Sequence, residues 1–163
     1  MESGFVVEYI DKQRILCAVV LEVKNQRLRL LTENAREVSL APNRLSHQSA
    51  ARLDLSMGRD RIIDMLKRLA TRRHELMQEI DVRELWQVLN TELEWIDLDT
   101  MTAFCFSENI TSDHESAVIR AFFSNRRYFK FESDGFFPHT ETHVEHLIAR
   151  EQEDARRRQL IQD

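Results

Sequence analysis

The stretch from residue 112 to residue 147 constrains the fold of this chain more than any other part of the sequence. Ser112 and Glu115 have the spacing of a capping box, in which two side chains satisfy free backbone groups at a helix start. We therefore expect a helix to begin at Ser112. The apolar residues after it recur at helical spacing and predict one buried face; they are Val118, Ile119, Phe122 and Phe123.

A β-hairpin is predicted to follow this helix. Residues 126–131 are rich in aromatic residues and alternate as a strand does, and Asp134-Gly135 is a strong signal for a two-residue hairpin turn. Thr142 and Glu145 then fit a second capping box, which predicts a last helix. Helix, hairpin and helix in this order are typical of a winged helix-turn-helix unit.

The N-terminal part of the chain has the pattern of short strands. Residues 15–23 form a run rich in β-branched residues, suited to a strand buried on both faces or to a bent barrel strand. Residues 24–26 and 33–35 have the composition of turns, and residues 36–40 make a last short strand before Pro42. Four or five short strands within about forty residues favour a small SH3-like β-barrel.

From Leu55 onward the sequence has helical periodicity. Asp81 is placed to cap a second helix, and Asp97 or Asp99 to cap a third. A long first helix is predicted from apolar residues three or four positions apart, which are Ile62, Met65, Leu66, Leu69, Leu76, Met77 and Ile80.

The predicted fold class is α+β, with a small SH3-like β-barrel followed by a mainly helical winged helix-turn-helix region. We place the barrel at residues 1–48, a connecting long helix at 49–80, the winged helix-turn-helix at 81–150 and a charged helix at 151–163. This last helix loses its apolar stripe and ends among charged residues. That ending indicates a further domain downstream.

The charge of the chain is unevenly distributed. The net charge is −5, which by itself does not favour binding to nucleic acid. However, residues 52–73 contain seven Lys or Arg against three acids, and residues 120–130 contain four basic residues and no acid. Residues 79–115 contain ten acids and one Arg. One face can therefore be basic on an acidic molecule, although solvated helix faces would give the same pattern.

Compartment and cysteine chemistry follow from simple observations. Cys17 and Cys105 each stand alone in an apolar run, without the spacing of a metal site or a disulfide framework. No signal peptide follows Met1, and no apolar run approaches the length of a membrane span. We therefore expect a cytoplasmic protein with reduced cysteines and no membrane partner.

The order of these elements resembles the N-terminal region of bacterial and chloroplast exoribonucleases of the ribonuclease II family. It is similar to the branch that begins with a winged-helix region instead of paired cold-shock domains. The likeness covers most of the chain and is best between Phe122 and Leu147. There the order is Phe-Phe, Arg-Arg-Tyr-Phe-Lys, Asp-Gly-Phe-Phe-Pro and then His-Val-Glu.

The resemblance implies an enzyme that hydrolyses single-stranded RNA from its 3′ end, one nucleotide at a time. In that family a cluster of aspartates in the catalytic domain holds magnesium, which suits phosphodiester chemistry. This chain lacks that motif, because Asp97 and Asp99 are explained as helix caps. We therefore expect no catalytic residue and no cofactor in this segment, with magnesium in the missing catalytic domain. The expected partners are single-stranded RNA and that downstream domain.

The predicted RNA-binding residues combine cations for phosphates with an aromatic ring for a base. In an alternating strand, Arg126, Tyr128 and Lys130 share one face, whereas Arg127 shares the other with two phenylalanines. An ordinary amphipathic hairpin would give the same pattern. The predicted residues are Arg120, Arg126, Arg127, Tyr128 and Lys130, together with Arg27 and Arg29 on the barrel.

Two other groups of residues are interpreted as structural. His139, His143 and His146 have separations seen in zinc sites, but no cysteine is nearby and the helical pair flanks an apolar stripe. Cys105 and His114 do not have the arrangement of a nucleophile and its base. We expect no metal site.

The leading hypothesis is a non-catalytic N-terminal region that guides single-stranded RNA to a ribonuclease II-like hydrolase domain. One alternative is a winged-helix DNA-binding regulator that inserts the helix at 113–124 into the major groove. That helix offers mainly Asp113, His114, Glu115 and Arg120, which is a poor surface for reading bases. The other alternative is a protein-interaction adaptor, which the net negative charge would suit.

Overall fold

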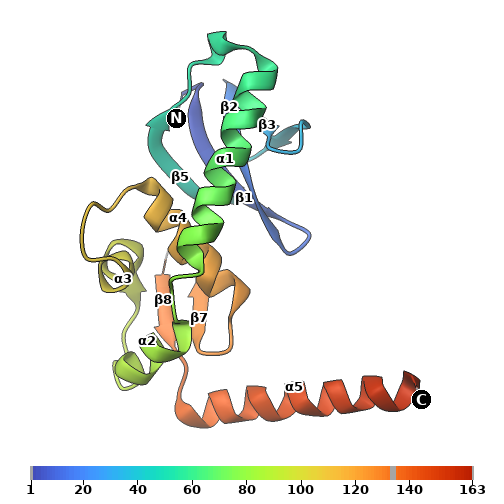
Figure 1. Ribbon diagram of the computed structural model, residues 1–163, viewed down its shortest axis with the longest axis vertical. Coiled ribbons are helices and arrows are strands. Elements are labelled where there is room, and N and C mark those ends of the chain that lie inside the picture. The colour runs from blue at the N-terminus through green and yellow to red at the C-terminus, as the bar shows by residue number, and fades with distance from the viewer. Residues whose placement is uncertain (1, 133–134, 163) are drawn as a thin grey trace.

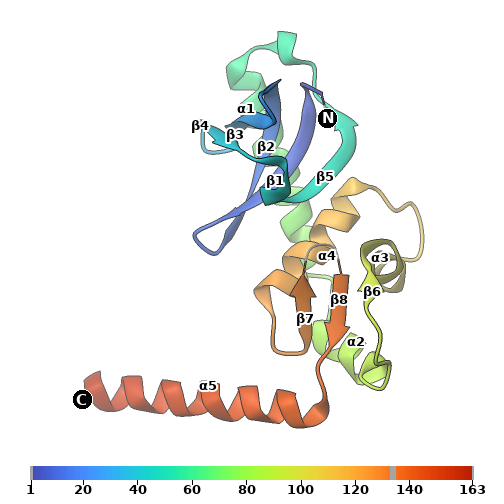
Figure 2. The same cartoon turned by 180° about the vertical axis from the view of Figure 1, so that it is seen from behind.

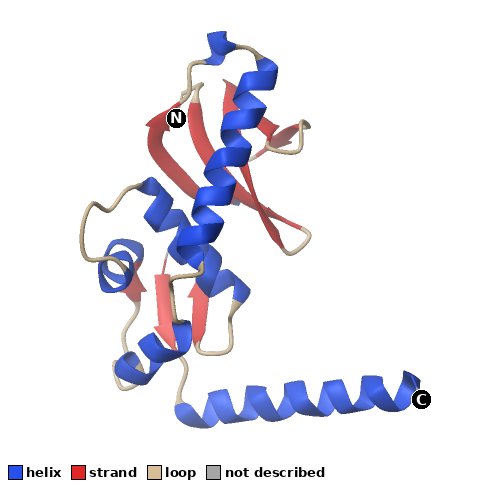
Figure 3. Ribbon diagram, viewed as in Figure 1, coloured by secondary structure: helices blue, strands red, loops and turns tan. Residues whose placement is uncertain are grey.

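The computed structural model describes residues 2–132 and 135–162 and shows two antiparallel sheets joined by a long helix (Figures 1, 2 and 3). This arrangement confirms the α+β class. The first sheet has the strand order β4-β3-β2-β1-β5. Its strands are β1 (Phe5–Asp11), β2 (Arg14–Lys24), β3 (Arg27–Thr32), β4 (Glu37–Leu40) and β5 (Leu45–Arg52), with a short 3₁₀ turn, η1 (Pro42–Arg44), before the last.

The first sheet does not close into the barrel predicted from the sequence. Strands β4 and β5 form its two edges instead of pairing with each other. The central strand β2 is buried on both faces over residues 16–20, which is one of the two strand types that the run at 15–23 suited, whereas residues 22–24 are exposed. One face packs within the curved sheet around Leu28 and Leu30, whereas the other packs through Cys17 and Val19 against α1 (Arg59–Met77). Because a helix covers that second face, burial on both sides of β2 does not require a closed barrel.

Strand β5 lies beyond the last strand predicted from the sequence. It runs to Arg52, past the expected end of this unit at residue 48. The segment has no β-branched residue, so its propensity does not indicate a strand. It pairs antiparallel with the free edge of β1, between Phe5 opposite Arg52 and Tyr9 opposite Leu45. Tertiary pairing therefore decides its conformation.

The second unit contains short helices and a three-stranded sheet of order β6-β8-β7. The hairpin expected after residue 126 is present, with Phe131 opposite Phe136. Asp134 of its predicted turn lies outside the described residues. After a 3₁₀ turn, η2 (Leu55–Met57), and α1 come α2 (Val82–Leu89), β6 (Ile96–Asp97), α3 (Leu98–Cys105), α4 (Ser112–Ser124), β7 (Phe129–Glu132), β8 (Gly135–Pro138) and α5 (Glu141–Gln162).

Two of the predicted helix caps are confirmed and two are wrong. Asp81 and Asp97 accept backbone hydrogen bonds at the starts of α2 and α3. The cap of α4 is Thr111 instead of Ser112, and His114 completes its capping box. At α5 the hydroxyl of Thr140, not that of Thr142, accepts from a backbone N–H of the first turn.

The residues of the wrongly predicted α4 box have a tertiary role instead. The Ser112 hydroxyl accepts from the backbone N–H of Ala50 on β5 at 3.1 Å. The Glu115 carboxylate lies 3.0 Å from Nε2 of His47, whose side chain is 3% exposed. Both contacts join the start of α4 to β5, so the capping pattern is replaced by contacts between the two units.

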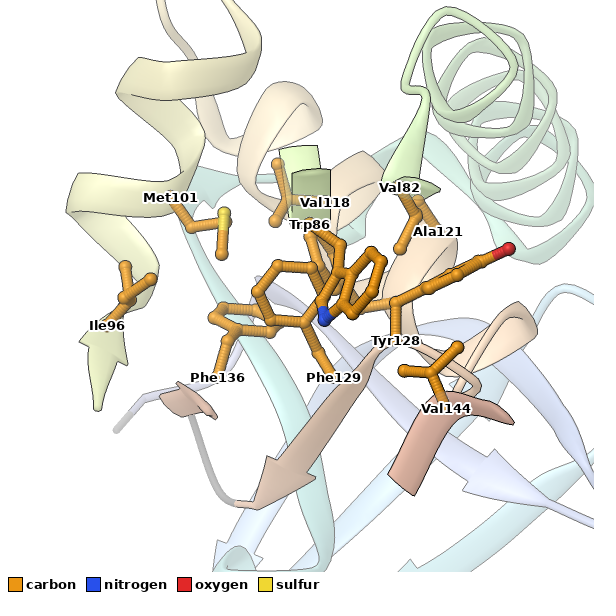
Figure 4. Close-up of a cluster of buried hydrophobic side chains, with 11 residues drawn as sticks. Val82, Trp86, Ile96, Met101, Val118, Ala121, Tyr128, Phe129, Phe136 and Val144 are labelled. Atoms are coloured by element: carbon orange, nitrogen blue, oxygen red, sulfur yellow. The ribbon is translucent and has the colours of Figure 1, made fainter. Parts of the chain in front are cut away.

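An aromatic core holds the second unit together (Figure 4). The Trp86 indole donates to the backbone carbonyl of His139 at 2.7 Å, and its ring lies 5.4 Å from that of Tyr128. Phe122 of α4 packs against Phe129 and Phe136 of the hairpin, with ring centroids 5.0 and 4.7 Å away. Helix α5 touches this core only through its first turns and then projects away from the molecule (Figures 1 and 2).

A buried cluster of charges joins the two units. Glu8 of β1 pairs with Arg73 of α1, whose Nη1 lies 3.4 Å from Glu8 Oε1, and with Arg120 of α4. The Ser116 hydroxyl donates to the same carboxylate. Arg73 also donates to Asp113 of α4 through Nε at 2.8 Å. We call Glu8, Arg73, Asp113, Ser116 and Arg120 the buried charge cluster.

The centre of the cluster is almost fully withdrawn from water. The side chains of Glu8 and Arg73 are 1% and 2% exposed. Burial acts to lower the pKa of Arg73, but Glu8, Cys17 and Asp113 outweigh it and raise that pKa above its ordinary value. The guanidinium therefore stays charged, and the acids must remain beside it to compensate it.

Removing the carboxylate should destabilise the chain strongly. We expect Glu8→Ala to lower the free energy of unfolding by about 3–5 kcal/mol, because two guanidinium groups would stay buried without their shared partner. Glu37→Ala is the control: its carboxylate pairs with Arg29 at the surface, and its loss should cost less than about 1 kcal/mol. Urea unfolding measures both. Equal effects would show that the cluster does not hold the units together.

Candidate nucleic-acid interface

Three of the predicted RNA-binding residues make intramolecular contacts that restrict them. Arg120 belongs to the buried charge cluster, and its side chain is 11% exposed. Tyr128 is 6% exposed and packs on Trp86 in the aromatic core, so its ring is not available to a base. Arg127 pairs with Glu151 of α5, and this contact raises its pKa.

We call Arg126, Arg127, Tyr128 and Lys130 the hairpin cluster; its two other residues, Arg126 and Lys130, do not share one strand face. Strand β7 begins only at Phe129, so the alternation of faces predicted for residues 126–128 does not occur. The guanidinium of Arg126 lies over the Phe123 ring, 4.2 Å from its centroid, and is exposed. Lys130 lies on β7, with Nζ 3.2 Å from Glu132.

The two predicted barrel residues lie on β3 and are paired with β4. Arg27 donates to the Ser39 hydroxyl and carbonyl at 3.1 and 3.0 Å. Arg29 lies between Glu22 and Glu37, at 3.4 and 3.3 Å. The two carboxylates offset the positive charge of Arg29, and the bonds to Ser39 orient the Arg27 side chain along β4. They do not bring either residue to the hairpin cluster.

A more suitable surface lies in the seam between the units. A groove of about 610 Å³ runs between the β1–β2 hairpin, α1 and the end of α4. We call it the basic groove. The side chains that give it its character are Arg14, Glu33, Lys67, His74, Arg120 and Phe123.

The electrostatics of the basic groove favour anions. Three permanent cations line it, of which Arg120 is already paired with Glu8. The one carboxylate of the lining, on Glu33, already accepts from the backbone N–H of Cys17 at 2.8 Å. Arg14 and Lys67 are both exposed. A concave surface with a surplus of positive charge concentrates polyanions, even on an acidic molecule.

The groove also offers an aromatic surface. Phe123 is half-buried at the end of α4, where Arg126 covers its ring. The exposed guanidinium plane that lies over this ring can itself stack on a base. Cations that follow a backbone, beside a plane on which a base can stack, are the combination that binds single strands without reading their sequence. The geometry therefore brings Arg120 and Arg126 together with residues that the sequence did not indicate.

Sequence reasoning missed the contribution of α1. Lys67, Thr71 and His74 are separated by four and three positions, so they share one helix face, and all three line the groove. The basic block at residues 52–73 did indicate a basic surface on this helix. Applying helical spacing within the block would have identified the face that carries Lys67, Thr71 and His74. Arg14 was one of the basic residues of the predicted barrel, but nothing in the sequence indicated that it lines a groove with α1, because only the fold of the β1–β2 hairpin brings it there.

The other candidate residues have structural surroundings. His114 Nδ1 accepts from the Thr111 backbone as part of the α4 cap, so it is not arranged as a base for Cys105. His139 lies beside His143, with ring centroids 4.2 Å apart. Burial lowers its pKa, and His143 and Lys130 lower it further. Within residues 2–132 and 135–162, no cluster of three or more His, Cys, Asp or Glu could hold a metal ion.

No helix in the described part of the chain is both long enough and apolar enough to cross a membrane.

Both cysteines should resist alkylation in the folded chain. Burial raises the pKa of Cys17 to about 12 and that of Cys105 to about 11, and only the thiolate reacts. At pH 9, about one Cys17 in a thousand would be thiolate, against about three quarters of ordinary cysteines, whose pKa is about 8.5. Iodoacetamide should therefore label both thiols far faster in guanidinium than in buffer, as read by mass spectrometry. Rapid labelling of the folded chain would contradict this.

We compared the chain with protein-family models, with curated proteins and with solved structures, and none of them matches it.

Proposed function

We propose that this chain is a non-catalytic N-terminal region of a ribonuclease II-like exoribonuclease and guides single-stranded RNA. The phosphates of the strand would lie in the basic groove, and a base would stack near Phe123. Hydrolysis from the 3′ end, with its magnesium, would belong to a domain downstream of α5. The chain itself would bind and orient the strand, and it would hinder structured RNA.

The arrangement of the elements supports the finer fold assignment that goes with this function. In the first sheet β5 returns to pair with β1 after a 3₁₀ turn, the strand order of an SH3-like barrel that is left open here. In the second unit, α2, β6, α3, α4, β7 and β8 follow the order of a winged helix, with β8 between β6 and β7. We propose both assignments on these grounds.

The basic groove is the observation that best supports RNA binding. It combines exposed cations from the sheet and α1 with an aromatic ring from α4, and it lies where the two units meet. Its exposed cations, Arg14 and Lys67, come from two elements, so they can contact phosphates of a strand that lies along the seam. A surface of this kind binds a strand without recognising its base sequence, which suits an enzyme that degrades RNA of many sequences.

The geometry does not favour the DNA-binding alternative. In that reading α4 would enter the major groove, but six of its residues are buried. Its N-terminal end is joined to β5 through Ser112 and Glu115 and to α1 through Asp113. A recognition helix presents its N-terminal residues to base edges. Here those residues contact the protein itself.

Charge reversal in the groove should weaken RNA binding. We expect Arg14→Glu with Lys67→Glu to raise the Kd for a fluorescein-labelled oligouridine by about tenfold or more at low salt. The plot of log K against log salt has a negative slope, and its magnitude should decrease by about 1.4. Two phosphate contacts are lost, and each contact with a single strand contributes about 0.7. Fluorescence anisotropy over a salt series measures both quantities.

Arg44→Glu with Arg83→Glu is the matched control, since it makes the same charge change at exposed sites outside the groove. A second variant changes Arg126, Arg127 and Lys130 to Glu. If that variant loses binding while the groove variant keeps it, the strand lies on the hairpin. Tighter binding to duplex DNA than to oligouridine would favour the regulator instead.

The downstream domain is tested by the size of the native gene product. An antibody against this chain should detect a band several-fold larger than 19.4 kDa in cell extract. A band at 19.4 kDa would remove the exoribonuclease from the proposal and leave a free-standing nucleic-acid-binding protein. The anisotropy experiment would keep its meaning in either case.

A further inference from the structure

A second groove lies between α2 and α3, on elements that do not line the basic groove. It has a volume of about 400 Å³. Its floor is formed by half-buried apolar side chains that also pack on the aromatic core, including Ile80, Leu85 and Leu89. Because the core fixes these side chains from below, the floor of the groove is preformed.

The rim of this groove exposes apolar side chains to water. Val88 on α2 is 74% exposed, and Phe104 on α3 is 52% exposed. Helix α2 buries Val82 and Trp86 on its inner face, so Val88 is not needed by the core. Exposed apolar residues beside a preformed apolar floor are typical of a docking site for another chain.

The charge around the groove specifies the chemistry of that partner. Glu79, Asp81 and Glu84 line it, and among the described residues that line it there is no Lys or Arg. The surrounding segment, residues 79–115, has ten acids and one Arg. A partner that carries positive charge beside its apolar residues is therefore favoured, because these carboxylates would attract it and repel an acidic partner.

We propose that this groove docks a short basic amphipathic helix of a separate partner protein. Helices α2 and α3 have eight residues each, so the groove is about 12 Å long and fits about two turns of a helix. Two apolar residues of the partner, three or four positions apart, would pack between Val88 and Phe104. Its Lys or Arg residues would face Glu79, Asp81 and Glu84.

This docking surface does not depend on RNA binding. The two grooves share no lining residue, so a variant of one leaves the other intact. Failure of the RNA experiment would remove the function proposed above and leave the docking proposal standing. Failure of the peptide experiment below would remove the docking proposal and leave the proposed RNA-binding function standing.

The probe is a fluorescein-labelled peptide of Leu and Lys, with Leu at positions i, i+3, i+4 and i+7, and anisotropy measures its Kd. Val88→Ser with Phe104→Ser should weaken binding by about tenfold or more, because both contacts are apolar. Leu93→Ser is the matched control: Leu93 is 68% exposed but does not line the groove, so the Kd should stay unchanged. Folding is not at risk, because all three side chains are exposed.

A second pair of variants tests the charge. Glu79→Lys with Glu84→Lys should weaken binding by about tenfold. Glu92→Lys with Glu94→Lys makes the same change outside the groove and should have a much smaller effect. Equal losses in the two pairs, or equal binding of a scrambled peptide, would overturn the proposal, since only net charge would then be recognised.

Sedimentation of the chain alone decides between a separate partner and a second copy. We expect a monomer at all concentrations tested, both for the wild-type chain and for the Val88→Ser, Phe104→Ser variant. A dimer that this variant dissociates would overturn the proposal, because the groove would then be an interface between two copies of the chain.

Discussion

The relative position of the two units depends on the ion pair between Glu8 and the two arginines beside it. Glu8 belongs to β1, Arg73 to α1 and Arg120 to α4, so one carboxylate joins three elements that are far apart in the sequence. Asp113 supplies the second negative charge, which balances the two guanidinium groups. Charges buried this deeply tolerate little displacement, because each is compensated only in one geometry. The cluster therefore specifies how the helices dock on the sheet.

The basic groove follows from this arrangement. The basic groove exists because α1 and α4 are held against the β1–β2 hairpin, which brings Arg14 opposite Lys67. Arg120 takes part in both features, since it compensates Glu8 and lines the groove. The acidic segment forms α2 and α3 and borders a different groove. A molecule with a net charge of −5 can thus present a basic surface and an acidic one, because the fold separates the charge blocks that the sequence already contains.

Local signals were reliable where the physical cause is local. A short polar side chain caps the helix that it precedes, and Asp81 and Asp97 both do so. The β-branched run at 15–23 predicted a strand, and residues 16–20 of that strand are buried on both faces. The signals failed where a distant element offered a better partner. Ser112 bonds to β5 instead of capping α4, and Tyr128 turns into the core because Trp86 is there. The hairpin cluster that we predicted for RNA was therefore divided between core, ion pairs and solvent.

The sequence by itself determined the α+β class, the hairpin, the order of the helices and the separation of charge into blocks. Each of these depends on periodicity, composition or capping, which are properties of neighbouring residues. The tertiary structure decided that the sheet stays open, that β5 completes it, that Arg120 pairs with Glu8 and that Arg14 and Lys67 line one groove. Those outcomes depend on which surfaces meet, and pairing between distant surfaces leaves no local pattern in the chain.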